Sequence, residues 1–141
     1  MGRKAARLWL VPAIAVTLGL ALAACGGGKT PMVDLNIAPA NFKQEILDTL
    51  RRTLDDPTNV HDAFISDPAL TQVGNEPRYT ACVRYNPRGL NRTYAGNTER
   101  IAYFYGGHLN QLVEPSKGEC AQAVYKPFPE LEKICFATKC N

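Results

Sequence analysis

The first residues of the chain determine how much of it is left to fold. Arg3, Lys4 and Arg7 form a basic start, and residues 8–22 form an uncharged, largely apolar run. The run has the length of the apolar core of an export signal and is shorter than the ~20 residues that a membrane-spanning helix needs. We therefore predict an export signal, followed by a single domain over residues 41–141 with a small core.

The end of the apolar run indicates the type of signal. Small residues precede Cys25 in the order Leu-Ala-Ala-Cys, which resembles the lipobox of bacterial lipoproteins. The resemblance implies that residues 1–24 are removed and that Cys25 carries diacylglycerol, usually with an amide-linked acyl chain. It covers residues 1–25 only, and we assign the globular part to no characterised family. A retained membrane anchor and a secretory signal cleaved at another position are the alternatives.

The residue that follows Cys25 indicates the membrane to which a lipoprotein is sorted. In the enterobacterial sorting rule, an aspartate at this place retains a lipoprotein in the inner membrane, and this chain has Gly26 there. We therefore expect a lipid-anchored protein of the bacterial cell envelope, on the outer membrane and facing the periplasm. Residues 25–40 are glycine-rich at their start and predict a flexible tether between anchor and domain.

The charge balance limits the partners. The chain has 16 basic and 13 acidic residues, and three basic residues leave with the signal, so the mature protein is formally neutral. A neutral chain gives no global argument for nucleic acid as a partner. The expected partners are the membrane, through the lipid anchor, and an envelope protein, glycan or lipid, with no cofactor.

An even number of cysteines follows Cys25, which is typical of two disulfides in an oxidising compartment. Three pairings are conceivable. We favour the one in which one disulfide closes a small C-terminal loop and the other closes a longer loop, which stabilises the folded domain more. A metal site is the alternative, but the chain lacks a Cys-x-x-Cys pair and neither His61 nor His108 flanks a cysteine. The favoured pairs are Cys82 with Cys120 and Cys135 with Cys140.

The domain opens with a predicted amphipathic helix. Asn41 is a suitable N-cap, and apolar residues recur at helical spacing from Phe42 to Leu54. Asp56 and Pro57 end the pattern, because the residue before proline disfavours the helical region. We expect the apolar stripe to cover a sheet, and the alternative is a surface for a partner or for lipid.

Four strand segments follow this helix. The alternation within Tyr79–Tyr85 gives one apolar face and places Cys82 on the opposite face. Gly106 and Gly107 predict a hairpin turn. Such a turn pairs Phe104 with Leu109, Ala102 with Gln111 and Ile101 with Leu112. The four segments are Val60–Ile65, Tyr79–Tyr85, Ile101–Tyr105 and Leu109–Val113.

The C-terminal part completes the predicted fold. Ala121–Tyr125 is a candidate short strand, and Pro129 starts one or two helical turns that direct Leu131 and Ile134 inward. The fold class we predict is α+β. One amphipathic N-terminal helix packs on an antiparallel sheet of three to four strands, and a disulfide-linked C-terminal tail covers part of the other face.

One group of residues suggests a ligand. Arginine and tyrosine recur along a central part of the chain, and guanidinium groups match phosphate and carboxylate. The competing interpretation is that these arginines point outward along a strand and pair with acidic residues. The surface proposed for anionic ligands comprises Arg84, Tyr85, Arg88, Arg92 and Tyr94.

No catalytic residue is assigned. His61 and His108 are the histidines, and no metalloprotease, nucleophile-elbow or phosphate-loop motif is present. We therefore expect a noncatalytic interaction or envelope-maintenance module, similar in size and anchoring to small accessory lipoproteins of outer-membrane assembly machines. A binding protein for an anionic envelope glycan or lipid and a small hydrolase are the alternatives. An interaction module predicts an exposed apolar patch or an unpaired strand edge.

Overall fold

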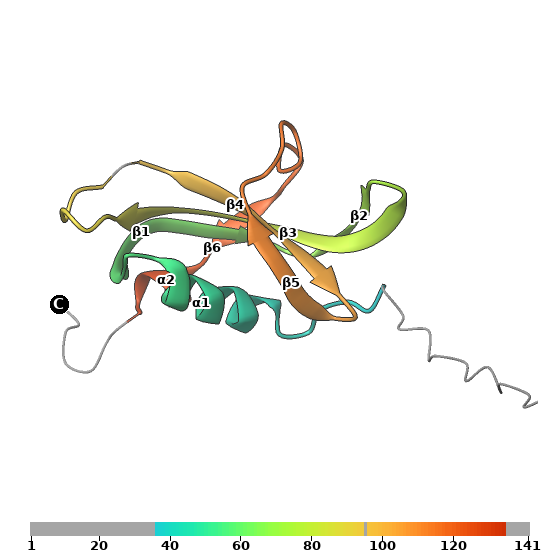
Figure 1. The fold of residues 1–141 in the computed structure, drawn as a ribbon, viewed down its shortest axis with the longest axis horizontal. Helices are drawn as coiled ribbons and strands as arrows, with labels where there is room; N and C mark the ends of the chain where they lie inside the picture. Colours follow the sequence, from blue (N-terminus) through green and yellow to red (C-terminus); the bar gives the residue numbers. More distant parts are fainter. Residues whose placement is uncertain (1–35, 95, 135–141) are drawn as a thin grey trace, which may run out of the picture. The chain divides into compact units, whose positions relative to one another are not determined.

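The computed structural model describes residues 36–94 and 96–134, which form a curved antiparallel sheet with α1 lying along one face (Figure 1). Neighbouring strands follow the order β5-β4-β3-β1-β6, and β2 pairs with β3 at the side of the sheet that β1 also occupies. In chain order the elements are α1 (Phe42–Thr53), β1 (Asp56–Ser66), β2 (Ala69–Val73), β3 (Glu76–Arg88), β4 (Thr98–Tyr105), β5 (His108–Val113), β6 (Tyr125–Pro127) and α2 (Pro129–Glu132).

The predicted fold class, an α+β domain with three to four strands and a disulfide-linked C-terminal tail, is wrong. Among the described residues the sheet has six strands, and helix is the minor component. The cysteine-linked segment is not a tail, because after Cys120 the chain returns to the sheet as β6 and then forms α2. The prediction missed β2 because its side chains are mostly exposed, so that no apolar face shows in the sequence.

The predicted apolar stripe of α1 packs on the sheet. Ile46, Leu47 and Leu50 are buried and share one core cluster with Val83 and Tyr85 of β3. This arrangement confirms the face predicted for the segment Tyr79–Tyr85. Asn41 lies at the N-cap position but its side chain makes no capping hydrogen bond.

The hairpin of β4 and β5 turns through Gly106 and Gly107, which have φ angles of 57° and 84°. Phe104 pairs with Leu109 as predicted, but a bulge follows, and Ala102 pairs with Leu112. The pairs predicted further from the turn are therefore wrong by one residue. A bulge adds one residue to one strand and shifts every later pair.

Gly107 supports a contact that a larger residue would disrupt. A Cβ atom at this position would lie 2.9 Å from Cγ2 of Ile37, and its φ of +84° is unfavourable for any L side chain. We expect Gly107→Ala to lower the free energy of unfolding by about 2 kcal/mol, through backbone strain and this contact.

Urea denaturation measures this cost, and Gly74→Ala is the matched control. Gly74 also has a positive φ, of +61°, but a Cβ there meets nothing within 4 Å. We expect the control to cost about 1 kcal/mol, which is the strain of the backbone conformation alone. Equal costs for the two variants would contradict the packing of Ile37 on the hairpin.

The C-terminal elements dock on an irregular part of β1. Asp62 has a φ of 53° at a register shift, and the N–H of Ala63 donates to Oε1 of Glu132 at 2.9 Å. The carbonyl of Ala63 accepts the N–H of Phe128 at 2.8 Å. Leu131 is fully buried. The burial of Leu131 and Ile134 confirms their predicted inward direction.

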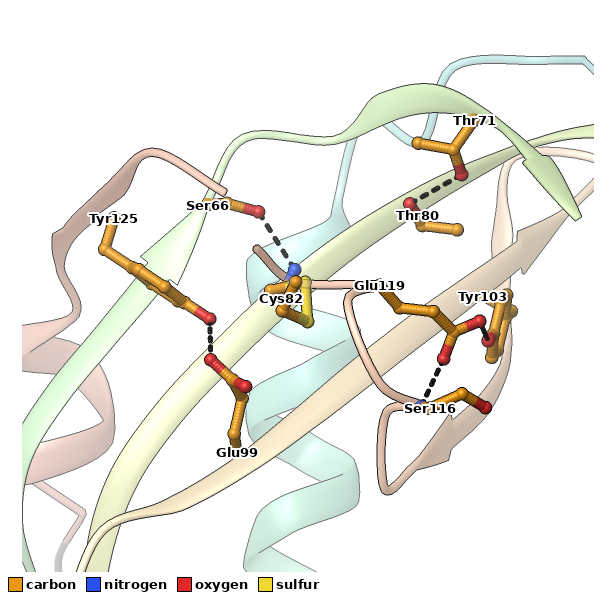
Figure 2. Close-up of a disulfide and its surroundings, with 10 residues drawn as sticks. Ser66, Thr71, Thr80, Cys82, Glu99, Tyr103, Ser116, Glu119 and Tyr125 are labelled. Atoms are coloured by element: carbon orange, nitrogen blue, oxygen red, sulfur yellow. Dashed lines mark hydrogen bonds between the residues drawn. A yellow bond between two sulfur atoms is a disulfide. The ribbon is translucent and has the colours of Figure 1, made fainter. Parts of the chain in front are cut away.

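A disulfide between Cys82 and Cys120 lies on the face of the sheet opposite α1 (Figure 2). The predicted pairing of these two cysteines is confirmed. Both are buried and form a second core cluster with Ile101. The disulfide thereby holds the segment between β5 and β6 against the sheet. The other predicted pair, Cys135 with Cys140, lies outside the described residues.

Candidate functional site

A cavity of about 300 Å³ lies beside the disulfide, on the face of the sheet that α1 leaves open. We call it the disulfide cavity. Ser66, Thr71 and Thr80 contribute hydroxyl groups to its lining, and Ala69 and Val124 contribute apolar groups. A cavity with an apolar lining and a few polar groups is the usual form of a binding pocket.

The cavity lies at the junction of β1 and β2, which both pair with β3. β1 ends at Ser66 and β2 begins at Ala69. At the junction the N–H of Cys82 donates to Oγ of Ser66 at 2.9 Å. The bend between β1 and β2 leaves the hollow next to this hydrogen bond.

Hydrogen bonds fix the opposite wall. The carboxylate of Glu119 accepts the hydroxyl of Tyr103 at 2.6 Å and the N–H of Ser116 at 2.5 Å (Figure 2). The bond from Tyr103, followed by that from Ser116, lowers the pKa of Glu119, so this carboxyl is ionised at neutral pH. Burial and the neighbouring carboxylate raise the pKa of Tyr103 to about 12. The wall therefore holds one fixed negative charge.

Polar contacts also define the rim and the floor of the cavity. Lys126 forms an ion pair with Asp67 at the rim. The hydroxyls of Thr71 and Thr80 lie 3.0 Å apart and share a hydrogen bond (Figure 2). This bond ties β2 to β3 on the cavity side.

The outer edge of β2, residues 69–73, borders the cavity, and we call it the β2 edge. Within the part of the chain that the structure describes, no strand pairs with it. In a two-residue hairpin the two residues that flank the turn exchange backbone hydrogen bonds. The backbone N–H and C=O groups of Val73, and of Thr71 two residues before it, therefore point toward β3. The backbone N–H and C=O groups of Leu70 and Gln72 are therefore directed outward.

Single positions on two other strands are occupied by contacts from helices. The carboxylate of Glu45 on α1 accepts the N–H of Leu109 in the edge strand β5. Glu132 and Phe128 occupy the N–H and C=O of Ala63 in β1. Such coverage is how proteins avoid unwanted strand pairing. The β2 edge carries five uncharged side chains, and Leu70 is 51% exposed.

The structure separates two of the residues predicted to bind anions. Arg84 stacks over the ring of Tyr125 at 4.8 Å, and it also lies 5.4 Å from the ring of Phe64. Tyr85, its neighbour on β3, points to the other face and is buried in the core at 2% exposure. These two side chains therefore cannot contribute to one ligand surface without a rearrangement of β3.

The remaining predicted residues lie near the far end of β3. Arg92 is exposed with a φ of 62°. The hydroxyl of Tyr94 lies 3.1 Å from Nε2 of His61, and the two rings are 4.7 Å apart. His108, at the hairpin turn, is 80% exposed and lies 3.0 Å from the carboxylate of Glu45. Neither histidine lines the disulfide cavity.

Arg88 has an acidic partner. Asp56 accepts the Nε–H of Arg88 at 2.7 Å and the hydroxyl of Thr58 at 2.6 Å. The hydrogen bond from Thr58, together with those from Arg88 and from the backbone, lowers the pKa of Asp56 to about 2. This pair fits the interpretation in which the arginines of this region balance acidic residues.

We expect Asp56→Asn to lower the free energy of unfolding at pH 7 by about 1–2 kcal/mol. The pKa of Asp56 is lower in the folded chain, so its contribution is complete above the ordinary value of 3.8. It disappears as the pH falls through about 2, where the carboxyl is protonated in both states. Urea denaturation of both proteins between pH 7 and pH 2 measures the difference.

Glu76→Gln is the control for this experiment. Glu76 pairs with Arg78 at 3.0 Å, but its side chain is 55% exposed, so we expect a cost below about 0.5 kcal/mol. A constant difference between wild type and Asp56→Asn over the whole pH range would contradict the role given to this carboxylate.

Sequence reasoning missed the β2 edge and the part that Ser66 plays in the cavity. Gly74 and Asn75 form the turn between β2 and β3 and were the available signal, because Gly-Asn is a hairpin dipeptide. Among the described residues, three or more potential metal ligands do not come together. The described helices include none long and apolar enough to cross a membrane. No protein-family model, curated protein or solved structure matches the chain.

Proposed function

We propose that this protein is a lipid-anchored, noncatalytic interaction module of the bacterial cell envelope. The observation that carries the proposal is the β2 edge, an uncharged and unpaired strand with an adjoining cavity. An unpaired strand edge is the feature expected of an interaction module, because it accepts an extended chain from a partner.

Binding at this edge has a simple physical basis. A bound strand makes main-chain hydrogen bonds to the outward groups of Leu70 and Gln72, and these bonds do not depend on its sequence. Every second side chain of the bound strand points toward the open face. There the disulfide cavity, lined by Thr71 and Thr80, accepts one side chain and selects among partners.

Acylation of Cys25 supplies the envelope location in this proposal. Two or three acyl chains hold a protein firmly at a bilayer, whereas one chain binds only reversibly. We expect Cys25→Ser to move the protein from the membrane fraction to the soluble fraction, as measured by fractionation and immunoblotting. Gly26→Asp keeps the lipidated cysteine and should stay in the membrane fraction. Membrane retention of Cys25→Ser would contradict the anchor.

Site-specific photo-crosslinking in the intact envelope tests the interaction role. A photoreactive amino acid replaces Leu70 at the β2 edge in the full-length, anchored protein. Leu90 is the control site, because it is 82% exposed and lies outside β2. We expect protein adducts at Leu70 that are absent at Leu90.

A second variant separates strand addition from chance contact. Gln72→Pro removes an outward N–H without removing a hydrogen bond between β2 and β3. It should abolish the Leu70 adducts while the variant stays folded, which urea denaturation checks. Identical adducts at both sites, or adducts that persist in a folded Gln72→Pro variant, would refute the proposal.

A further inference from the structure

We propose that the partner of the β2 edge is the same edge of a second copy of this chain. The two β2 strands would pair antiparallel about a two-fold axis and join the two sheets into one. This inference rests on the proposed function and names the occupant of its site. It follows from the register, the charge and the length of the β2 edge.

The register of the edge is self-complementary. A two-fold axis at Thr71 places Thr71 opposite its copy and Leu70 opposite Gln72 of the second copy. The groups directed outward belong to Leu70 and Gln72, so each pair exchanges both of its hydrogen bonds. Two such pairs satisfy all four N–H and C=O groups that each copy presents between positions 70 and 72.

The charge of the edge favours a copy of the same chain. All five residues of β2 are uncharged, so a two-fold pairing brings no like charges together, which is the usual obstacle to pairing of identical edges. The nearest charges on β3 are Glu76 and Arg78, which pair with each other at 3.0 Å. Asp67, just before the edge, pairs with Lys126. Each copy is therefore electrostatically neutral where it meets the other.

The free edge also has the length that this pairing needs. With Thr71 on the axis, Ala69 lies opposite Val73 of the second copy, and the turn at Gly74 lies opposite Pro68. The next partner along the edge is Tyr125 of β6, which pairs with Ser66. The added strand thus ends at its own turn before it reaches the position that β6 occupies.

The small area of this contact makes the dimer too weak to form in dilute solution. Pairing of two five-residue strands buries less than the ~1,200–2,000 Å² of a standard stable interface. Anchors in one membrane raise the effective concentration of the copies without any new contact. The dimer is therefore expected in the membrane and not in dilute solution.

Disulfide trapping in membranes tests the register directly. Opposed residues of a non-hydrogen-bonded pair have Cα atoms about 4.5 Å apart, within the range for a disulfide. We expect full-length, anchored Thr71→Cys to give about tenfold more covalent dimer than Leu90→Cys after mild oxidation, as expected when the anchors hold paired copies together. Non-reducing gels measure the dimer, with wild type as the background for the natural cysteines.

Two further variants make the result specific. Adding Gln72→Pro to Thr71→Cys should return the dimer to the Leu90→Cys level, because it removes one hydrogen bond from each pair. Copies that carry Leu70→Cys should cross-link to copies that carry Gln72→Cys more than either links to itself. A Thr71→Cys dimer that is insensitive to Gln72→Pro would reflect collision and would overturn the inference.

The outcome also distinguishes this inference from the proposed function. Failure of Thr71→Cys to dimerise, with photo-adducts of Leu70 to a different protein, overturns self-pairing and leaves the interaction role intact. Loss of both the disulfide dimer and the Leu70 adducts overturns both. Dimers together with Leu70 adducts that contain only this chain support both.

Discussion

Replacing both Cys82 and Cys120 with alanine will lower the free energy of unfolding by about 4 kcal/mol, the stabilisation that the chain-entropy description gives a loop of this length. The two cysteines are separated by 38 residues in the sequence and both are buried. A domain of this size has a total stability of about 5–15 kcal/mol. The double variant should therefore melt roughly 15–30 °C below the wild type.

The loss has a second contribution on the open face of the sheet. Ile101 packs in the same cluster as the disulfide, and Tyr103 and Tyr125 pack against that cluster. The segment between β5 and β6 is otherwise held by a few hydrogen bonds, of which the bond from Tyr103 to Glu119 is one. Without the disulfide, this segment and the cavity wall that it forms should be the first parts of the domain to open.

The two single variants provide the controls. Cys82→Ala and Cys120→Ala break the same bond, so each should cost nearly as much as the double variant, and the two costs should not add. Cys135 and Cys140 are present in every variant and cancel in the comparison. A cost below about 1 kcal/mol for the double variant would contradict the stabilising role given to this disulfide.

The spacing of apolar residues in the sequence predicted those helices and strands that bury one face. Helix α1 and strand β3 each have a buried face and a different second face, so their spacing shows in the sequence. The turn at Gly106 was predictable because its backbone requires a positive φ angle. The link from Cys82 to Cys120 followed from placing Cys82 on the face away from the helix.

The rest depended on tertiary packing. Residues of β2 are largely exposed, so the strand has no apolar alternation, and the β2 edge and the cavity beside it were both missed. The bulge in β5 and the left-handed conformation of Asp62 in β1 shift pairing by whole residues, and no local residue preference reveals either one. The predicted anion surface ignored that Arg84 and Tyr85 alternate to opposite faces of β3.

The C-terminal elements should depend on one aromatic side chain. β6 has three residues and α2 has four, too few to form alone, because short helices and isolated strand pairs are marginal in water. Phe128 joins them, is completely buried, and donates its N–H to the carbonyl of Ala63. Its ring also lies 5.9 Å from Nζ of Lys43 on α1, so it connects α1 and β1 with the C-terminal segment.

We therefore expect Phe128→Ala to lower the free energy of unfolding by about 3–5 kcal/mol, through lost burial and the cavity left behind. Urea denaturation measures the loss, and Val124→Ala is the control, since Val124 is 75% exposed and should cost less than about 0.5 kcal/mol. Phe128→Leu keeps most of the apolar volume and should recover part of the loss. If Phe128→Ala costs no more than Val124→Ala, α2 does not form part of the core. Amide exchange then gives an independent check, because the N–H of Ala63 is protected only while Glu132 accepts its hydrogen bond.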